Sequence, residues 1–119
     1  MAQPMLVLSR RDVAALLPLE ECIVAVERAF RLHAEGKTPP PGVLGIHAGE
    51  GGFHIKAAGL TLTRPYFAAK TNLNFSANPA RFGLPAIQGI VTLFDAENGA
   101  PLYEKARAAQ RGLVLDLAG

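Results

Sequence analysis

Three consecutive prolines, Pro39 to Pro41, divide the chain into two parts with different hydrophobic periods. A run of prolines has no backbone N–H groups to donate and holds its backbone extended, so neither a helix nor a central strand crosses it. Before the prolines, apolar residues recur at helical spacing, and after them apolar and polar residues alternate. Helices followed by strands, without regular alternation of the two, indicate an α+β domain and not a doubly wound parallel sheet.

Two helices are predicted before the prolines, after a short apolar run at Met5–Leu8 that is predicted as an edge strand. The sequence Ser9-Arg10-Arg11-Asp12 is typical of a capping box, in which the Ser9 hydroxyl and the Asp12 carboxylate accept hydrogen bonds from free amides of a first helical turn. Pro18 ends this short helix or opens the next one. The second helix is amphipathic and stops at Gly36, with apolar residues at Leu19, Cys22, Ile23, Val26 and Phe30.

The rest of the chain is predicted to form a curved, mostly antiparallel sheet, with the long helix packed on one of its faces. Four segments are bounded by turn residues and have strand character: Val43–Ala48, Phe53–Leu60, Tyr66–Phe75 and Ala86–Phe94. Two prolines make Ser76–Pro85 a surface loop, and Asp95–Gly99 is a turn before a short returning strand at Ala100–Leu102. A last helix is predicted over Tyr103–Gln110, followed by an apolar strand.

Composition limits the classes of function. The 119 residues are enough for one domain and too few for two. The 12 basic residues are scattered and exceed the 10 acidic residues by only 2, so no nucleic-acid footprint is expected. Cys22 is the only cysteine, which excludes an intrachain disulfide. No secretory signal or membrane-spanning run is recognisable, so we expect a soluble, cytoplasmic protein that binds neither nucleic acid nor membrane.

Alternate residues of the predicted strands place polar side chains together on one face of the sheet. If the strands bury their apolar faces, the opposite face carries two ammonium groups, an imidazole and two amides, from His54, Lys56, Lys70, Asn72 and Gln88. These groups suit the carboxylate of a small molecule but include no nucleophile–base pair. The alternative is an ordinary solvated face on which lysines oppose aggregation. No metal site is expected, because the histidines lie on different elements without carboxylates at ligand spacing: His33, His47 and His54.

Several segments in succession resemble the ornithine cyclodeaminase/mu-crystallin family. The family's substrate domain resembles FHIKAAGL (Phe53–Leu60), YFAAKTNLNF (Tyr66–Phe75), NPARFGLPAIQG (Asn78–Gly89) and LFDAENGAPL (Leu93–Leu102), and its opening strand and helices resemble Met5–Phe30. The final Tyr103–Gly119 is similar to the family's carboxy-terminal helix and tail. In full-length members a dinucleotide-binding domain separates these parts, whereas here Leu102 is followed directly by Tyr103. The resemblance therefore implies a substrate and dimerisation part at residues 1–102 and a tail at 103–119, within a single domain.

The resemblance also implies roles for particular residues. Lys70 falls on the family's catalytic lysine, in the strand before the Asn-Pro loop. The resemblance supports Lys56 less, since that position varies among family branches. The other predicted substrate contacts rest on strand alternation and not on the resemblance: His54, Asn72 and Gln88. Gly42 stands near the place of a carboxylate-binding arginine of many members, and Ala86 matches a threonine that some members place beside the substrate. The family uses NAD or NADP. No G-x-G-x-x-G sequence follows any predicted strand, so we expect this chain to bind neither cofactor.

Three functions are open at this point. We expect a truncated substrate-binding and dimerisation domain of an NAD(P)-dependent cyclodeaminase, or of an amino- or imino-acid dehydrogenase. Such a domain would form a homodimer in which the sheets of two subunits combine into a barrel-like body, and would bind a small amino or keto acid without turnover. Alternatively, the chain is one component of a split enzyme whose dinucleotide-binding domain lies on another chain, or it is a purely structural interaction module.

Overall fold

The computed structural model describes residues 6–101, 103–104, 110–111 and 113–116, which form three helices and eight strands. In chain order the elements are β1 (Leu6–Leu8), α1 (Arg10–Leu16), α2 (Leu19–Ala34), β2 (Gly42–Ala48), β3 (Gly51–Thr61), β4 (Pro65–Asn74), α3 (Asn78–Phe82), β5 (Ile87–Asp95), β6 (Tyr103–Glu104), β7 (Gln110–Arg111) and β8 (Leu113–Asp116). Helices followed by strands confirm the predicted α+β class.

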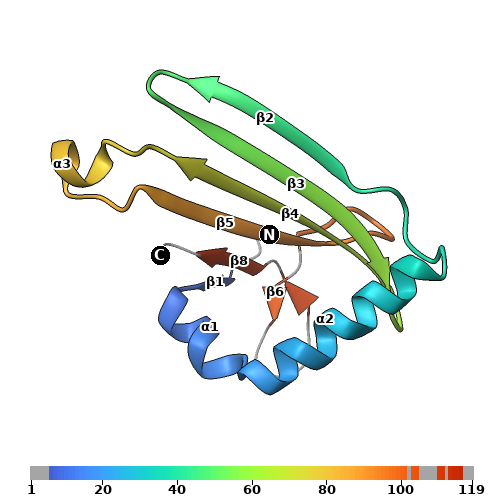
Figure 1. Ribbon diagram of the computed structural model, residues 1–119. Helices are drawn as coiled ribbons and strands as arrows, with labels where there is room; N and C mark the ends of the chain where they lie inside the picture. Colours follow the sequence, from blue (N-terminus) through green and yellow to red (C-terminus); the bar gives the residue numbers. More distant parts are fainter. Residues whose placement is uncertain (1–5, 102, 105–109, 112, 117–119) are drawn as a thin grey trace.

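Six strands form one curved sheet in the order β1-β8-β5-β4-β3-β2 (Figure 1). The four long strands, β2 to β5, are antiparallel neighbours, as predicted. Strand β8 lies antiparallel to β5 and parallel to β1, so strands from opposite ends of the chain meet at one edge of the sheet. Strands β6 and β7 form a separate two-stranded ribbon.

The predicted capping box opens α1. The Ser9 hydroxyl accepts a hydrogen bond from the Asp12 backbone N–H at 3.2 Å, and the Asp12 carboxylate accepts one from the Ser9 backbone N–H at 2.9 Å. The backbone bond from Ser9, together with the bond from its side chain, lowers the pKa of Asp12. Pro18 is the first residue before α2, and Gly36 follows its end with φ 71°. Both helix boundaries therefore lie where the sequence predicts them.

The long helix α2 was predicted to pack on one face of the sheet, but it does not do so. Its apolar side chains remain accessible, with Ile23 57% and Phe30 70% exposed. Among the described residues, no strand makes an extensive contact with α2. Pro39 of the connector lies against Gly59 near the end of β3, and from there α2 runs back along one side of the sheet toward α1 (Figure 1). The expectation that α2 covers the apolar face of the sheet is therefore wrong.

Two segments differ from the predicted local structure. The expected loop Ser76–Pro85 contains the short helix α3, because Pro79 suits a first helical turn and Gly83 ends it with a left-handed φ of 66°. The expected helix over Tyr103–Gln110 is wrong at both ends, where Tyr103–Glu104 pairs with Gln110–Arg111; residues 105–109 lie outside the described residues. Pairing of the following strand β8 with β5 and β1 holds this part of the chain at the sheet, which overrides local helix propensity.

A partly buried ion pair fastens β4 to β5. The Arg64 guanidinium donates to the Asp95 carboxylate, whose side chain is only 3% exposed. The second Asp95 oxygen accepts a hydrogen bond from the Glu97 backbone N–H at 2.8 Å, which fixes the turn after β5. The Ala96 backbone N–H donates to the Pro65 carbonyl at 3.1 Å across the same junction. Asp95 thus holds the start of β4, the end of β5 and the following turn together.

We expect Arg64→Ala to lower the free energy of unfolding by about 3 kcal/mol, because the buried Asp95 carboxylate loses its cationic partner. Arg81→Ala is the matched control: Arg81 pairs with Glu50 at 3.2 Å, but these side chains are 59% and 75% exposed. Its loss should cost less than about 1 kcal/mol. Urea denaturation of the two variants and the parent chain measures the difference, and equal costs would contradict the assigned role of Asp95.

Candidate functional site

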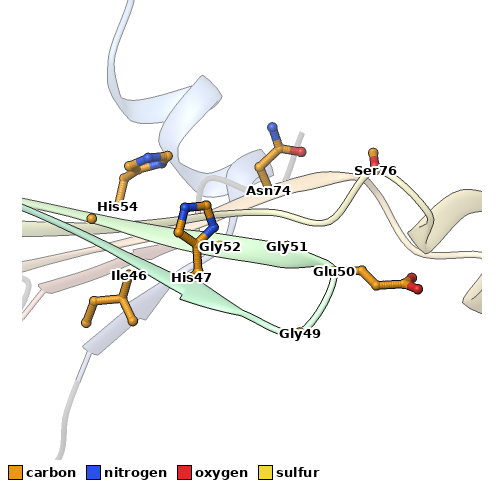
Figure 2. A pocket seen from close by; sticks show the side chains of 10 residues that line it. Ile46, His47, Gly49, Glu50, Gly51, Gly52, His54, Asn74 and Ser76 are labelled. Carbon is orange, nitrogen blue, oxygen red and sulfur yellow. The ribbon is translucent and has the colours of Figure 1, made fainter.

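The register of β2 to β5 sorts their side chains onto two faces, since residues directly opposite each other on neighbouring strands share a face. The polar face, as it is called below, carries His47, His54, Lys56, Lys70, Asn72 and Asn74. The apolar face carries Leu44, Ile46, Phe53, Ile55, Leu73 and Ile90. Figure 2 shows the division at the β2–β3 hairpin, where His47 and His54 point to one side and Ile46 to the other.

Four of the five polar residues predicted to lie together do so. They line one pocket of ≈270 Å³, the lysine pocket, formed by His54, Lys56, Lys70 and Asn72. Lys56 of β3 lies directly opposite Lys70 of β4, and His54 lies directly opposite Asn72 in the neighbouring row. The alternation of β3 and β4 therefore places these side chains as the sequence predicts.

Gln88, the fifth residue, is on the other face, so the prediction that it joins this group is wrong. It lies directly opposite Leu73, and its side chain donates a hydrogen bond to the Pro85 carbonyl at 3.4 Å. The residue of β5 that lies opposite Asn72 is Gly89. Strand β5 is flanked by β4 and β8 and carries apolar residues on both faces, so its alternation alone does not show which residues share a face with Lys70.

The electrostatics of the lysine pocket are unusual for a sheet surface. Like charges directly opposite on antiparallel strands destabilise the pair, yet Lys56 and Lys70 occupy such positions. Ion pairs in the described part of the chain use Lys37, Arg31, Arg64 and Arg81, and none involves these two lysines. Two ammonium groups without a described carboxylate partner make this pocket a site of local positive charge.

Glycines on the neighbouring strands make room for the side chains of His54 and Asn72. Gly45 lies opposite His54, and Gly89 lies opposite Asn72, so a glycine stands at each end of this row of four strands. A Cβ on Gly89 would lie 2.4 Å from Oδ1 of Asn72, which shows that the Asn72 carboxamide occupies the space above the glycine. The sequence analysis missed this role, although a glycine inside a strand can mark the close approach of another group.

A second pocket, the hairpin pocket, adjoins the first along β3 and has a volume of ≈520 Å³ (Figure 2). Its polar lining comes from His47, Glu50, His54, Asn74 and Ser76, and glycines of the β2–β3 hairpin form much of the rest. His54 lines both pockets. This pocket was not predicted from the sequence, where His47 was considered only as a metal ligand.

The described residues offer little support for other kinds of site. No cluster of three or more histidine, cysteine, aspartate or glutamate side chains in this part of the chain is placed to hold a metal ion. No helix in the described ranges is both long and apolar enough to cross a membrane. The polar face is therefore the candidate site among the described residues.

Two curated proteins match most of the chain. An alanine dehydrogenase of Archaeoglobus fulgidus is 32% identical over 97 residues, which cover 82% of this chain and 29% of the relative. The nodulation efficiency protein NfeD of Rhizobium meliloti is 31% identical over 103 residues, which cover 86% of this chain and 32% of the relative. The chain thus spans about a third of the length of the relatives it matches. No protein-family model matches it.

Solved structures agree with these matches. An archaeal alanine dehydrogenase dimer with bound NAD superposes with a TM-score of 0.73 at 29% identity, over 96% of this chain and 31% of that one. Thermococcus litoralis Δ1-pyrroline-2-carboxylate reductase, in complex with NADH and L-proline, gives 0.70 at 25% identity, over 94% of this chain and 32% of that one. A lysine cyclodeaminase shares the fold, with a TM-score of 0.59 at 24% identity.

Over about a third of their length, the chain is therefore similar to alanine dehydrogenases and to a pyrroline-2-carboxylate reductase. The chain is an ornithine cyclodeaminase/mu-crystallin-like fragment, and the residues that the structure describes include no Rossmann domain. The family resemblance predicted from the sequence is confirmed.

The role of Gly89 gives a test of the site geometry. In Gly89→Ala the new methyl group must displace the flexible end of the Asn72 side chain, so we expect a clear shift of the Asn72 side-chain amide resonances in an NMR spectrum. The free energy of unfolding should fall by less than about 1.5 kcal/mol, because a side chain and not the backbone gives way.

Gly51→Ala is the contrasting variant. A Cβ there would lie 2.5 Å from the Phe75 ring and 2.6 Å from the Asn74 backbone oxygen, and the backbone atom cannot easily move. We expect a loss of about 3 kcal/mol in urea denaturation. Unchanged Asn72 resonances in Gly89→Ala would contradict the assigned packing.

Proposed function

We propose that the lysine pocket binds the carboxylate of a small amino or keto acid, with Lys70 as its anchor. The chain would be the substrate-binding and dimerisation part of an NAD(P)-dependent amino- or imino-acid enzyme. The observation that carries this proposal is the pairing of Lys56 with Lys70 across β3 and β4. A carboxylate between the two ammonium groups would remove their repulsion and form charge-assisted hydrogen bonds with both.

The neighbouring row would complete the recognition of such an acid. His54 and Asn72 line the same pocket and can donate hydrogen bonds to a second oxygen of the ligand. At ≈270 Å³ the pocket is small and suits a small ligand. The relatives support this substrate class, because they include alanine dehydrogenases and a reductase in complex with L-proline.

The cofactor would come from outside these 119 residues. Two of the similar structures hold NAD or NADH, but the described strands of this chain are not followed by a glycine-rich loop and a helix that could hold a pyrophosphate. The residues present therefore do not fit a nicotinamide dinucleotide, and hydride transfer needs one held against the substrate. We expect this chain alone to bind the small acid without catalysing a reaction. We also expect the protein to be cytoplasmic. A split enzyme would instead require a separate chain with the dinucleotide-binding domain.

We also propose that the apolar face is a subunit interface between two copies of this chain. No large side chain in the described residues is fully buried, and Leu44, Ile46 and Ile90 remain exposed on this face. A contiguous apolar patch of this kind is uncommon on a soluble monomer and typical of an interface. The similar archaeal alanine dehydrogenase is a dimer, and two such curved sheets facing each other would give a barrel-like body.

One prediction of the proposed function concerns Lys70. Small amino or keto acids such as alanine and pyruvate should shift NMR resonances of the polar face, with a Kd near the millimolar range, or about 4 kcal/mol of binding free energy. Lys70→Ala should abolish these shifts while the fold is kept, because the anchoring ammonium group is lost.

Lys37→Ala removes the same charge from the connector after α2, where Lys37 pairs with Glu35 at 2.8 Å, and should leave the shifts unchanged. Ligand shifts that survive in Lys70→Ala would make Lys70 an ordinary sheet lysine. If the parent chain shows no shifts with any such acid, the structural-module alternative replaces the proposed function.

The second prediction concerns the apolar face. Sedimentation at micromolar concentration should give twice the 12.6 kDa mass of one chain. Ile90→Asp places a charge in the proposed interface and should convert the protein to monomers, because a buried unpaired carboxylate is costly.

Ile87→Asp is the matched control on the same strand. Ile87 is similarly exposed, at 59% against 50% for Ile90, but it lies opposite Asn74 on the polar face. This variant should remain a dimer. Monomers in the parent sample, or equal effects of the two substitutions, would refute an interface on the apolar face.

A further inference from the structure

Starting from the proposed function, we infer that the ligand carries a second anionic group, which the hairpin pocket receives. A dicarboxylic acid would then span the two pockets, and a diamino acid would be disfavoured. This inference rests on one observation: the lysine pocket and the hairpin pocket meet at His54 and together form one polar track along β3.

The spacing of the track suits a short diacid. Lys56 and His54 are two residues apart on the same face of β3, which corresponds to about 7 Å along the strand. The next row along the track contains His47, Gly52 and Asn74. A ligand with one carboxylate between the two lysines would therefore extend its other end past His54 toward His47.

Glycines leave room for that end of the ligand. His54 lies beside Gly45, and both His47 and Asn74 lie beside Gly52, so each of these three side chains has a cross-strand neighbour without a side chain. In Figure 2 the side chains of His47, His54 and Asn74 stand on the same side of the hairpin. A side chain at Gly52 would enter this space, whereas one at Gly45 would contact the His54 ring, which lies 3.4 Å from the position of a Cβ there.

The charges of the lining decide which second group fits. Both imidazoles, the Asn74 amide and the Ser76 hydroxyl can donate hydrogen bonds to an anion. The one carboxylate of the hairpin pocket, on Glu50, is already paired with Arg81 at 3.2 Å. The hairpin pocket thus offers several hydrogen-bond donors and one paired carboxylate, and the adjoining pocket holds two lysines, so an anion is favoured over a cation.

Titration calorimetry with pyruvate, 2-oxoglutarate and ornithine tests this inference. We expect 2-oxoglutarate to bind about ten-fold more tightly than pyruvate, because its second carboxylate gains charge-assisted hydrogen bonds. Ornithine should bind no more tightly than alanine, which is titrated as the reference amino acid. His47→Ala should reduce the affinity for 2-oxoglutarate toward that for pyruvate and leave pyruvate binding unchanged.

His33→Ala is the control, since His33 lies on α2 and contacts Thr38 at 2.7 Å, away from the track. Equal affinities for pyruvate and 2-oxoglutarate, or tighter binding of ornithine, would overturn the inference while the proposed function stands. A preference for the diacid that survives in His47→Ala would refute the hairpin pocket as the second site. Absence of binding by every acid would defeat both the inference and the proposed function.

Discussion

The register between β3 and β4 is the constraint on which the rest of the structure depends. It places Lys56 opposite Lys70 and His54 opposite Asn72, and it gives the sheet one polar and one apolar face. Because side chains alternate with a period of two, a slip by one residue on either strand would move a lysine to the apolar face. Two ammonium groups held side by side are unfavourable by themselves, and an anionic ligand turns the same geometry into a binding site.

The two faces of the sheet have different proposed roles, since one would bind a ligand and the other would contact a second subunit. The polar face keeps glycines beside its functional side chains, which leaves space at the cost of packing. The apolar face exposes large side chains that the long helix does not cover. A second subunit on the apolar face would bury these side chains and leave the polar face open to a ligand.

The sequence predicts the strands of the sheet and four of the five grouped polar residues, because alternation in β3 and β4 is clear. It does not place Gln88 correctly, since β5 has apolar residues on both faces and its register is set by the intervening segment with α3. Local hydrophobic patterns predict neither the position of α2 nor the pairing of Tyr103–Glu104 with Gln110–Arg111. The hairpin pocket was missed because its shape comes from glycines, whose effect appears only when neighbouring strands are paired.

The most direct test of the two-faced sheet is solvent access to methyl groups, measured by NMR with a soluble paramagnetic agent. A single chain exposes Ile90 and Ile87 to a similar extent, at 50% and 59%, although they lie on opposite faces. At a concentration where the protein is a dimer, we expect the Ile87 methyl signals to be strongly attenuated and the Ile90 signals to be protected. Equal attenuation of the two residues would contradict a covered apolar face and, with it, the division of the sheet into a subunit face and a ligand face.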